Sequence, residues 1–267
     1  MTTERTDLPF DLDEATRTLA ARDERLAELI ATTRPFAIHA DEPRSPYEAL
    51  LRSIAYQSIS GKAAETIFAR VRALGRDGRL PTPEEMLRLR TPALRKAGLS
   101  AAKVLAMKDL ARKTIDAVVP TLAQARRMSD EELVERLVSV RGIGVWSVEM
   151  FLIFRLGRPD VLPVHDLGVR KGWCVTYGKS HLPRPQDLLA FGERWRPYRS
   201  VASWYMWRAF ERAGYAVTNK IGAAQPRARR TTRQRPAAGA AGAAEPRAAR
   251  LRRKRSRLAA GQTASIL

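Results

Sequence analysis

Two glycines stand directly before a tryptophan-bearing apolar run in the segment VRGIGVWSVEM, which spans residues 140–150. Gly142 and Gly144 can adopt positive φ without steric cost, and they leave no side chain between the backbone and an approaching group. The first N–H groups of a helix that starts here would lack an intrahelical acceptor and carry partial positive charge, which suits a phosphate. The pattern predicts that Gly142, Ile143 and Gly144 bind an anion through the backbone. A tight, exposed turn without a ligand is the alternative that the glycines leave open.

The charge of the chain indicates the kind of partner. There are 48 Lys and Arg against 28 Asp and Glu, a formal net charge of +20. Residues 222–267 hold 12 of the basic residues and one acidic residue, so this tail carries +11 and residues 1–221 carry +9. Such an excess favours a polyanion. The tail is mostly Ala, Gly, Pro and Arg, so we expect it to be disordered, either as an arm that adds phosphate contacts or as a dispensable extension.

The content of metal-binding and apolar residues excludes several classes. One cysteine, Cys174, permits no intramolecular disulfide and no four-cysteine zinc or iron–sulfur site, and the three histidines are scattered. We therefore expect no metal bound by side chains and no cofactor. The chain has no apolar run of about 18 residues and no apolar signal segment at its start. This predicts no membrane association and a cytoplasmic location, and the Ala- and Arg-rich composition is typical of a bacterial chain.

Helix-start signals recur along the chain. Ser45, Thr82 and Ser129 each precede a glutamate by three residues, which is the spacing of a capping box, and a proline follows the first two. We find no alternating strand pairs and no internal repeat. The sequence predicts an all-α fold of about nine or ten helices between roughly residues 12 and 214, with the order ending near Ile221.

Two helices are expected to flank the glycine turn. The second, residues 145–156, is apolar on nearly every face and should be a central buried helix. The first, residues 130–140, should bury one side, formed by Leu133, Val134, Leu137 and Val138. A middle block of about 45–160 and the segments on either side of it each hold several helices, which predicts a two-lobed domain over residues 1–221.

Separated segments of the chain share one resemblance. LVSVRGIGVWSVEMF resembles the helix-hairpin-helix of DNA repair glycosylases, and Asp166 follows Gly144 by 22 residues within LPVHDLGVRKGW. SPYEALLRSIAYQSISGKAA, LRKAGLSAAKVLAMKDLA and ERWRPYRSVASWYMWRAFE resemble segments of the 3-methyladenine DNA glycosylase II (AlkA-like) family, in the same order. Only 44 residues precede Ser45. The chain is thus similar to the short form of the family, which lacks the N-terminal β-domain.

This resemblance implies a function. Members flip an alkylated purine of the 3-methyladenine type out of double-stranded DNA, hydrolyse its N-glycosidic bond and act as monomers, so we expect a nucleoid-associated base-excision enzyme. Asp166 is then the implied catalytic carboxylate, because bond cleavage develops positive charge on the deoxyribose. Its position also suits the N-cap of a helix that starts at Leu167, and the two roles are compatible.

Other positions acquire roles through the same resemblance. Trp146 and Trp207 match positions that line the base pocket, where a cationic purine facing an indole gains about 0.5–2 kcal/mol. Met150 stands where some relatives have a tyrosine, a departure that leaves the range of substrates open. Bifunctional relatives carry a lysine at the position of Trp146, since their lyase reaction needs an amine nucleophile. A tryptophan there implies hydrolysis without lyase activity.

Further DNA contacts follow from the segment YQSIS. The matching loop of the family fills the space of the flipped base, so Gln57 is expected to contact the orphaned base, with Ser58 beside it, and Ile59 to insert as an apolar wedge. A core position is the alternative for Ile59. Lys62 is a candidate phosphate contact. The resemblance also implies a monovalent cation held by the backbone carbonyls of Val138, Val140 and Ile143.

Two other functions stay open on the sequence alone. A non-catalytic DNA-binding protein could use the same hairpin as a clamp, but a carboxylate such as Asp166 facing a polyanion would cost affinity. A glycosylase for oxidised or mismatched bases is the second, and Trp146 and the single cysteine argue against its main versions. The basic tail suits all three functions.

Overall fold

The computed structural model describes residues 8–33, 35–36 and 45–218 of the chain. Within these ranges it contains thirteen α-helices, two short 3-10 helices and no strand. The helices are α1 (Leu12–Arg22), α2 (Glu24–Thr32), α3 (Pro46–Tyr56), α4 (Gly61–Arg72), η1 (Arg76–Gly78), α5 (Pro83–Arg88), α6 (Thr91–Lys96), α7 (Ala101–Ile115), α8 (Leu122–Arg127), α9 (Asp130–Val138), α10 (Val145–Phe154), α11 (Leu167–Thr176), α12 (Pro185–Gly192), η2 (Glu193–Trp195) and α13 (Arg199–Thr218).

The expected all-α class is confirmed, but the expected number of nine or ten helices was too low. Three of the helices, α5, α6 and α8, have six residues each. A helix of fewer than two turns shows too little apolar repeat to be counted by that repeat alone, and α5 was indicated only by its cap at Thr82. The expected end of order near Ile221 and the expected disorder of residues 222–267 lie outside the described residues. In the part of the chain described, no helix is long and apolar enough to cross a membrane.

The three predicted helix starts are confirmed as N-caps. The hydroxyls of Ser45, Thr82 and Ser129 accept hydrogen bonds from the backbone N–H three residues later, at 3.3, 3.2 and 3.1 Å. Thr82 also receives the second bond of the capping box, because the Glu85 carboxylate accepts from its backbone N–H at 3.1 Å. These caps satisfy amides that would otherwise lack a partner in the first turn.

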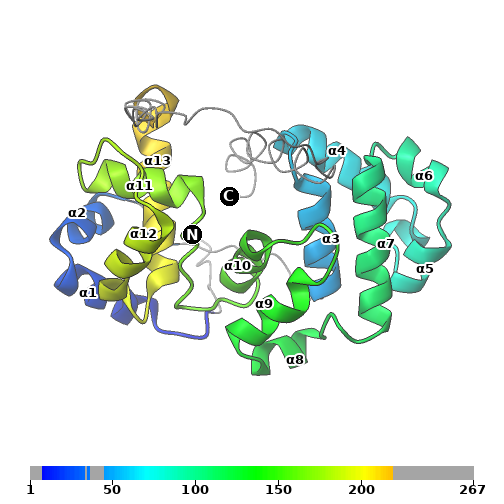
Figure 1. The fold of residues 1–267 in the computed structure, drawn as a ribbon, viewed down its shortest axis with the longest axis horizontal. Coiled ribbons are helices and arrows are strands. Elements are labelled where there is room, and N and C mark those ends of the chain that lie inside the picture. Colours follow the sequence, from blue (N-terminus) through cyan, green and yellow to red (C-terminus); the bar gives the residue numbers. More distant parts are fainter. Residues whose placement is uncertain (1–7, 34, 37–44, 219–267) are drawn as a thin grey trace, which may run out of the picture.

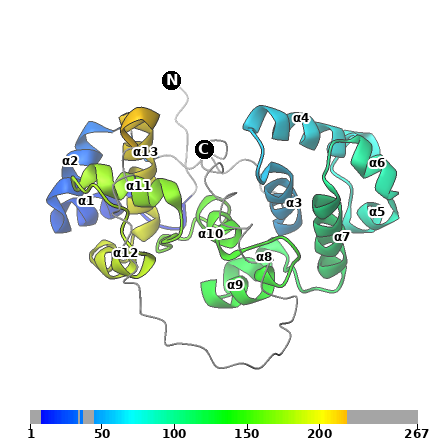
Figure 2. The same cartoon turned by 45° about the horizontal axis from the view of Figure 1, so that its top comes forward.

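The helices form two groups, as expected (Figures 1 and 2). The middle lobe contains α3 to α10, in which α7 packs against α3, α5 and α6, and α10 packs against α9 and α3. The flanking lobe contains α1, α2, α11, α12 and α13, and α13 packs against α11, α2 and α1. In both views α10 is the helix of the middle lobe that lies toward the flanking lobe.

Helices α11 and α13 approach each other closely in the flanking lobe. Gly172 of α11 lies against the backbone of Met206 of α13, and a Cβ atom at Gly172 would be only 1.8 Å from the Met206 carbonyl oxygen. No side chain fits there without moving a helix. Met206 is adjacent to Trp207, so this contact sets the position of a residue that the sequence assigns to the base pocket.

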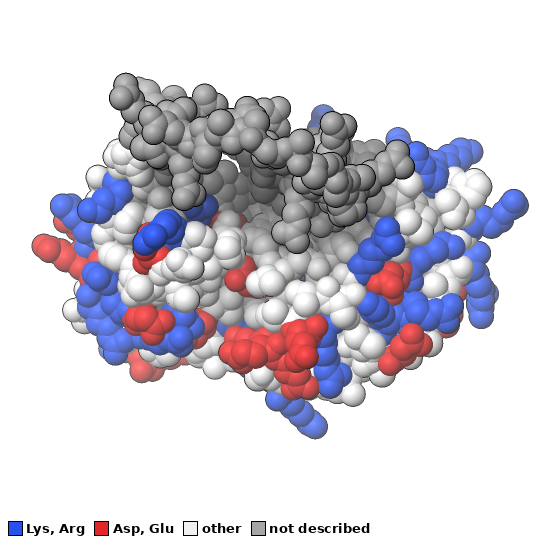
Figure 3. Space-filling view, viewed as in Figure 1, with Lys and Arg blue, Asp and Glu red and all other residues white. Residues whose placement is uncertain are grey.

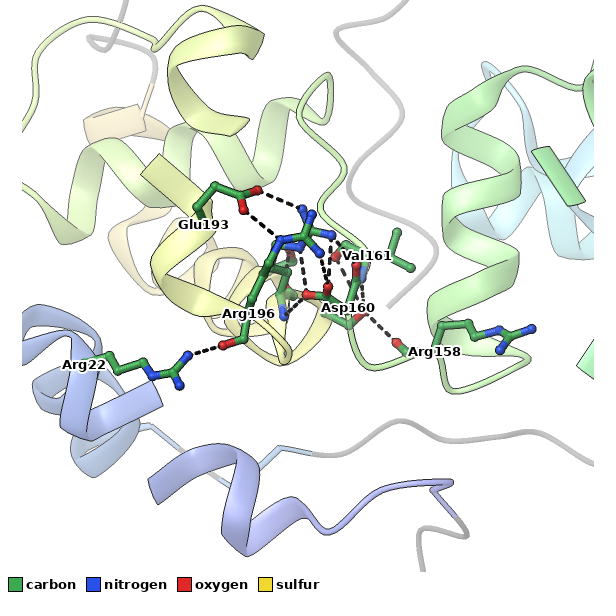
Figure 4. A network of polar contacts seen from close by, with 9 residues as sticks. Arg22, Arg158, Asp160, Val161, Glu193 and Arg196 are labelled. Carbon is green, nitrogen blue, oxygen red and sulfur yellow. Dashed lines mark hydrogen bonds and ion pairs between the residues drawn. The ribbon is translucent and has the colours of Figure 1, made fainter. Parts of the chain in front are cut away.

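The segment between α10 and α11 makes polar contacts with both lobes, and Figure 4 shows those that Asp160 makes with the flanking lobe. The guanidinium of Arg158 donates to the carbonyl of Met128 at 2.6 Å and pairs with Asp130 at 3.0 Å, both in the middle lobe. Two residues later, Asp160 accepts from Arg199 at the start of α13 at 2.7 Å and from Arg196 at 2.6 Å. Two residues of one short loop, Arg158 and Asp160, are therefore fixed to different lobes.

Candidate functional site

Asp166 is buried at the start of α11, where only 3% of its surface is exposed. It is the N-cap of that helix, since its Oδ1 accepts from the backbone N–H of Val169 at 2.8 Å. Its carboxyl also accepts from two indoles: Oδ1 from Nε1 of Trp207 at 2.8 Å, and Oδ2 from Nε1 of Trp146 at 2.7 Å. All three partners are donors, so the carboxyl acts only as an acceptor, which is the role of an ionised carboxylate.

The two tryptophans reach Asp166 from different lobes. Trp146 lies in the first turn of α10 and is partly buried, whereas Trp207 lies on α13 and is 2% exposed. The ring of Trp207 stacks on that of Phe154, with centroids 5.5 Å apart. Met150, on α10, is 9% exposed. The structure therefore brings together the three predicted residues Asp166, Trp146 and Trp207, and it holds them by indole N–H bonds that the sequence did not indicate.

A second carboxyl group, that of Glu149, lies close to Asp166. Glu149 belongs to α10, one turn after Trp146. Burial raises the pKa of Glu149 to about 7, and the charge of Asp166 adds to this increase. Its Oε2 is buried and accepts no hydrogen bond from the described residues. Sequence reasoning missed this residue, although a signal was present: Glu149 is the only charged residue of the helix VWSVEMFLIF.

The glycine turn joins α9 to α10 as a helix-hairpin-helix. Gly142 adopts φ 81°, as a glycine readily does, but Gly144 is extended with φ −109°, so only one of the two uses the left-handed region. A Cβ atom at Gly144 would meet nothing within 4 Å. Gly144 is the N-cap of α10 and provides no side-chain cap. The amides of Gly144, Val145 and Trp146 have no acceptor among the described residues, which leaves them for an anion.

Two residues around this turn differ from expectation. Val138 was expected to be buried but is 37% exposed, because the buried Leu133 and Leu137 lie on one side of α9 and Val138 lies about 100° further round the helix than Leu137. Ile143 is 5% exposed, and its N–H donates to the carbonyl of Val140 at 3.0 Å. The side chain of Ile143 thus anchors the turn in the core, and its amide is already bonded.

The turn is fixed to α7 by charged side chains. Asp109 Oδ2 accepts from the backbone N–H of Arg141 at 2.7 Å. Lys113 donates to the carbonyl of Ser139 and pairs with Asp109 at 3.5 Å. These two residues of α7 were not identified from the sequence, since no local pattern connects them to a turn about 30 residues later. They hold the hairpin in place without using the amides at the start of α10.

The segment expected to fill the space of the flipped base is the loop between α3 and α4. Ser58 is exposed and adopts φ 58°, and Ile59 is partly buried. Gln57 is partly buried, and its side-chain Nε2 donates to the carbonyl of Gly142 at 2.9 Å. Lys62 is exposed in the first turn of α4. The loop and the hairpin are therefore adjacent, as two elements that contact one DNA duplex would need to be.

The donor set for the expected cation consists of neutral carbonyls, which suit a hard monovalent ion. The carbonyl of Val140 accepts from Ile143, so one of its two lone pairs is in use. No group of three or more His, Cys, Asp and Glu side chains in the described residues could hold a metal ion.

Charge alone does not single out a nucleic-acid surface on the face shown in Figure 3. Lys and Arg gather toward both ends of this face, and an acidic group lies over α9, whose first turn carries Asp130, Glu131 and Glu132. The unpaired amides of the hairpin are a more specific indication of where a phosphate would bind than the net charge is.

Comparison with known proteins identifies the family of this chain. The family of HhH-GPD superfamily base excision DNA repair proteins matches residues 51–197. DNA-3-methyladenine glycosylase 1 of Schizosaccharomyces pombe is 38% identical over 215 residues, which cover 79% of this chain and 93% of the relative. The structure of the S. pombe 3-methyladenine DNA glycosylase in complex with abasic DNA aligns with a TM-score of 0.68 at 37% identity, covering 73% of this chain and 95% of that one. The DNA-3-methyladenine glycosidase of Bacillus halodurans aligns with a TM-score of 0.68 at 31% identity, covering 81% and 96%. This chain belongs to the HhH-GPD superfamily of base excision DNA repair proteins.

Proposed function

We propose that this protein is a DNA glycosylase that hydrolyses the N-glycosidic bond of alkylated purines of the 3-methyladenine type in double-stranded DNA. One observation carries the proposal: the Asp166 carboxylate is buried and accepts three N–H bonds, between α10 and α13 and next to an uncapped hairpin. A structural N-cap would need only the bond from Val169. The two indole donors hold the carboxylate in one orientation, which a reaction centre requires.

The chemistry follows from the charge that develops as the bond breaks. Departure of the base leaves an oxocarbenium-like sugar, and Asp166 stabilises its positive charge. At a separation of about 4 Å and an effective dielectric constant of about 20, one such pair contributes about 4 kcal/mol, which corresponds to about three powers of ten in rate. The same carboxylate orients the attacking water.

The DNA is held through its phosphates and its extruded base. A phosphate binds the amides at the start of α10, where Gly144 leaves the approach open. Ser58 and Ile59 enter the space left by the base, and Lys62 contacts the backbone. The extruded base lies in a pocket lined by Trp146, Met150 and Trp207, the last of which also donates to the carboxylate of Asp166. The protein acts as a monomer, and a monovalent cation at the hairpin carbonyls would strengthen the phosphate contact.

We further propose that the enzyme is monofunctional. The position that would provide an amine nucleophile is occupied by Trp146, whose indole nitrogen carries its N–H toward Asp166. An indole does not form a Schiff base, so the sugar is attacked by water and an abasic site remains. Borohydride added during the reaction should therefore trap no covalent complex between protein and DNA.

The experiment that tests the proposal is release of 3-methyladenine and 7-methylguanine from methylated duplex DNA, with DNA binding measured in parallel. The wild-type protein should release base, and Asp166→Asn should reduce the rate about a thousandfold while it keeps its affinity for DNA. No release by the wild type, with tight binding, would contradict the proposal and favour oxidised or mismatched substrates or a non-catalytic clamp.

A further inference from the structure

The loop between α3 and α4, residues 57–60, is held at its first residue and just before it. Lys103 of α7 donates from Nζ to the carbonyl of Ala55 at 2.8 Å, near the end of α3. Gln57 donates from Nε2 to the carbonyl of Gly142 at 2.9 Å, across 85 positions of sequence. Ser58, which follows, adopts φ 58°. A residue other than glycine keeps this left-handed conformation only where its surroundings hold it.

The hairpin end of this contact does not depend on Gln57. Arg141 is bonded to Asp109 and Ser139 is bonded to Lys113, so the turn is fixed to α7 on its own. Gly142 lies within this turn and adopts its φ of 81° without strain, as a glycine can. The hydrogen bond from Gln57 therefore constrains the loop and not the hairpin. If this bond were lost, the loop would be free to move while the hairpin stayed in place.

The hairpin and the loop perform different tasks in the proposed reaction. The hairpin binds a phosphate through amides at the start of α10, whereas the loop enters the duplex. A loop that moved independently of the bound phosphate would lose conformational entropy on entering the duplex, which would weaken insertion. A fixed distance between the two contacts avoids this loss.

We propose that Gln57 is a positioning residue that fixes the 57–60 loop to the helix-hairpin-helix, so that phosphate binding aligns the loop with the base to be extruded. This inference rests on the proposed function for its context. It differs from the expectation that Gln57 reads the orphaned base, because its side-chain amide is directed to the hairpin carbonyl. Gln57 acts through Ser58 and Ile59 and takes no part in bond cleavage.

The test compares the affinities of the full chain for two kinds of duplex. One is undamaged, and the other contains a tetrahydrofuran abasic-site analogue placed opposite each of the four bases in turn. Gln57→Met removes the donor at nearly constant side-chain length. Gln186→Met, which makes the same change at an exposed position of α12, is the matched control. Thermal unfolding of each variant confirms that it folds.

The expected result is a loss of preference for the abasic duplex of about three- to tenfold in Gln57→Met, equal for all four opposite bases. Affinity for the undamaged duplex and its dependence on salt should stay within about twofold, since the hairpin amides are unchanged. A loss that varies with the opposite base would overturn the inference in favour of a base contact. An equal loss on undamaged DNA, or no loss at all, would also overturn it.

This assay is independent of the chemistry. The abasic analogue has no glycosidic bond to a base, so binding can be measured whether or not the protein releases methylated purines. Failure of base release with a normal Gln57 effect would contradict the proposed function alone. Base release without a Gln57 effect would contradict this inference alone.

Discussion

Helices α10 and α11 begin in opposite ways. The N-cap of α10 is Gly144, which has no side chain, and the amides of the first turn are unpaired among the described residues. The N-cap of α11 is Asp166, whose carboxylate bonds the first turn of its own helix and two indoles as well. Each helix start favours a negative charge. In the proposed reaction the start of α10 would receive this charge from a DNA phosphate, whereas the start of α11 carries it as part of the chain.

If the proposed function holds, this difference separates DNA binding, at the start of α10, from bond cleavage, at the start of α11. An uncapped start costs stability in the free protein and gains affinity when a phosphate arrives. A start capped by a buried carboxylate stabilises the fold, and the same carboxylate is already fixed when a substrate charge develops beside it. Substitutions at or beside the two helix starts test this difference.

The largest effect is expected from removing one of the N–H groups that donate to the Asp166 carboxylate. Trp207→Phe keeps an aromatic ring beside Phe154 and deletes the N–H bonded to Oδ1. A hydrogen bond to a charged group contributes about 1.5–3 kcal/mol. Because the phenyl ring is also smaller than the indole, the free energy of unfolding should fall by about 3 kcal/mol in urea denaturation. Trp173→Phe is the control, because the buried Nε1 of Trp173 has no partner in the described structure. Equal losses in the two variants would show that the bond to Asp166 is unimportant.

The second carboxyl near Asp166 should make stability depend on pH. The pKa of Glu149 is about 7 in the folded protein against 4.5 for the free group, so the folded state holds this proton more tightly. The free energy of unfolding should therefore fall by on the order of 2–3 kcal/mol as pH rises from about 4.5 to about 7. Above about pH 7 the whole of this loss of stability should be present. Glu149→Gln should lack this part of the pH dependence. Parallel pH profiles of wild type and variant would contradict the assignment.

The start of α10 can be converted to resemble that of α11. Gly144→Asp places a carboxylate at an N-cap where a Cβ atom meets nothing within 4 Å and where φ of −109° suits any residue. DNA affinity should fall about tenfold, because the new carboxylate repels the phosphate and competes with it for the amides at the start of α10. Gly144→Asn caps the helix without the charge and should lose less. If the two variants bind DNA equally well, the charge at this start has no effect.

The smallest effect is expected at Ser129, an ordinary N-cap that serves as a reference for the starts of α10 and α11. Ser129 accepts from the amide of Glu132 at the start of α9. Ser129→Ala should lower the free energy of unfolding by about 1 kcal/mol and leave base release and DNA binding unchanged. A change in DNA affinity here would mean that α9 also takes part in binding.

The parts of the site that were predictable depend on local pattern. The turn at Gly142 and Gly144 and the N-cap position of Asp166 follow from residue types over a few positions, and the three hydroxyl caps do too. One prediction from local pattern, the burial of Val138, was wrong. Val138 is an apolar residue of α9, yet it is exposed, because the apolar pattern does not say how wide a side of the helix packs against the core.

The supporting residues were not predictable in the same way. Asp109 and Lys113 reach the hairpin from α7 only because α7 and the turn are packed together in three dimensions. The direction of the indole N–H groups of Trp146 and Trp207 likewise depends on how the lobes meet. Sequence identified which residues were candidates for the site, and tertiary packing determined what holds them.

The contact between Gly172 and Met206 has a consequence for interpreting variants of this enzyme. A methyl group at Gly172 would be about as far from the Met206 carbonyl oxygen as a covalent bond is long, so α11 and α13 would have to separate. Asp166 is carried by the first helix and Trp207 by the second, and separation would break the bond between them. A repair-deficient variant with a change at this glycine would be classified by its phenotype as an active-site defect, although the altered position has no reactive group.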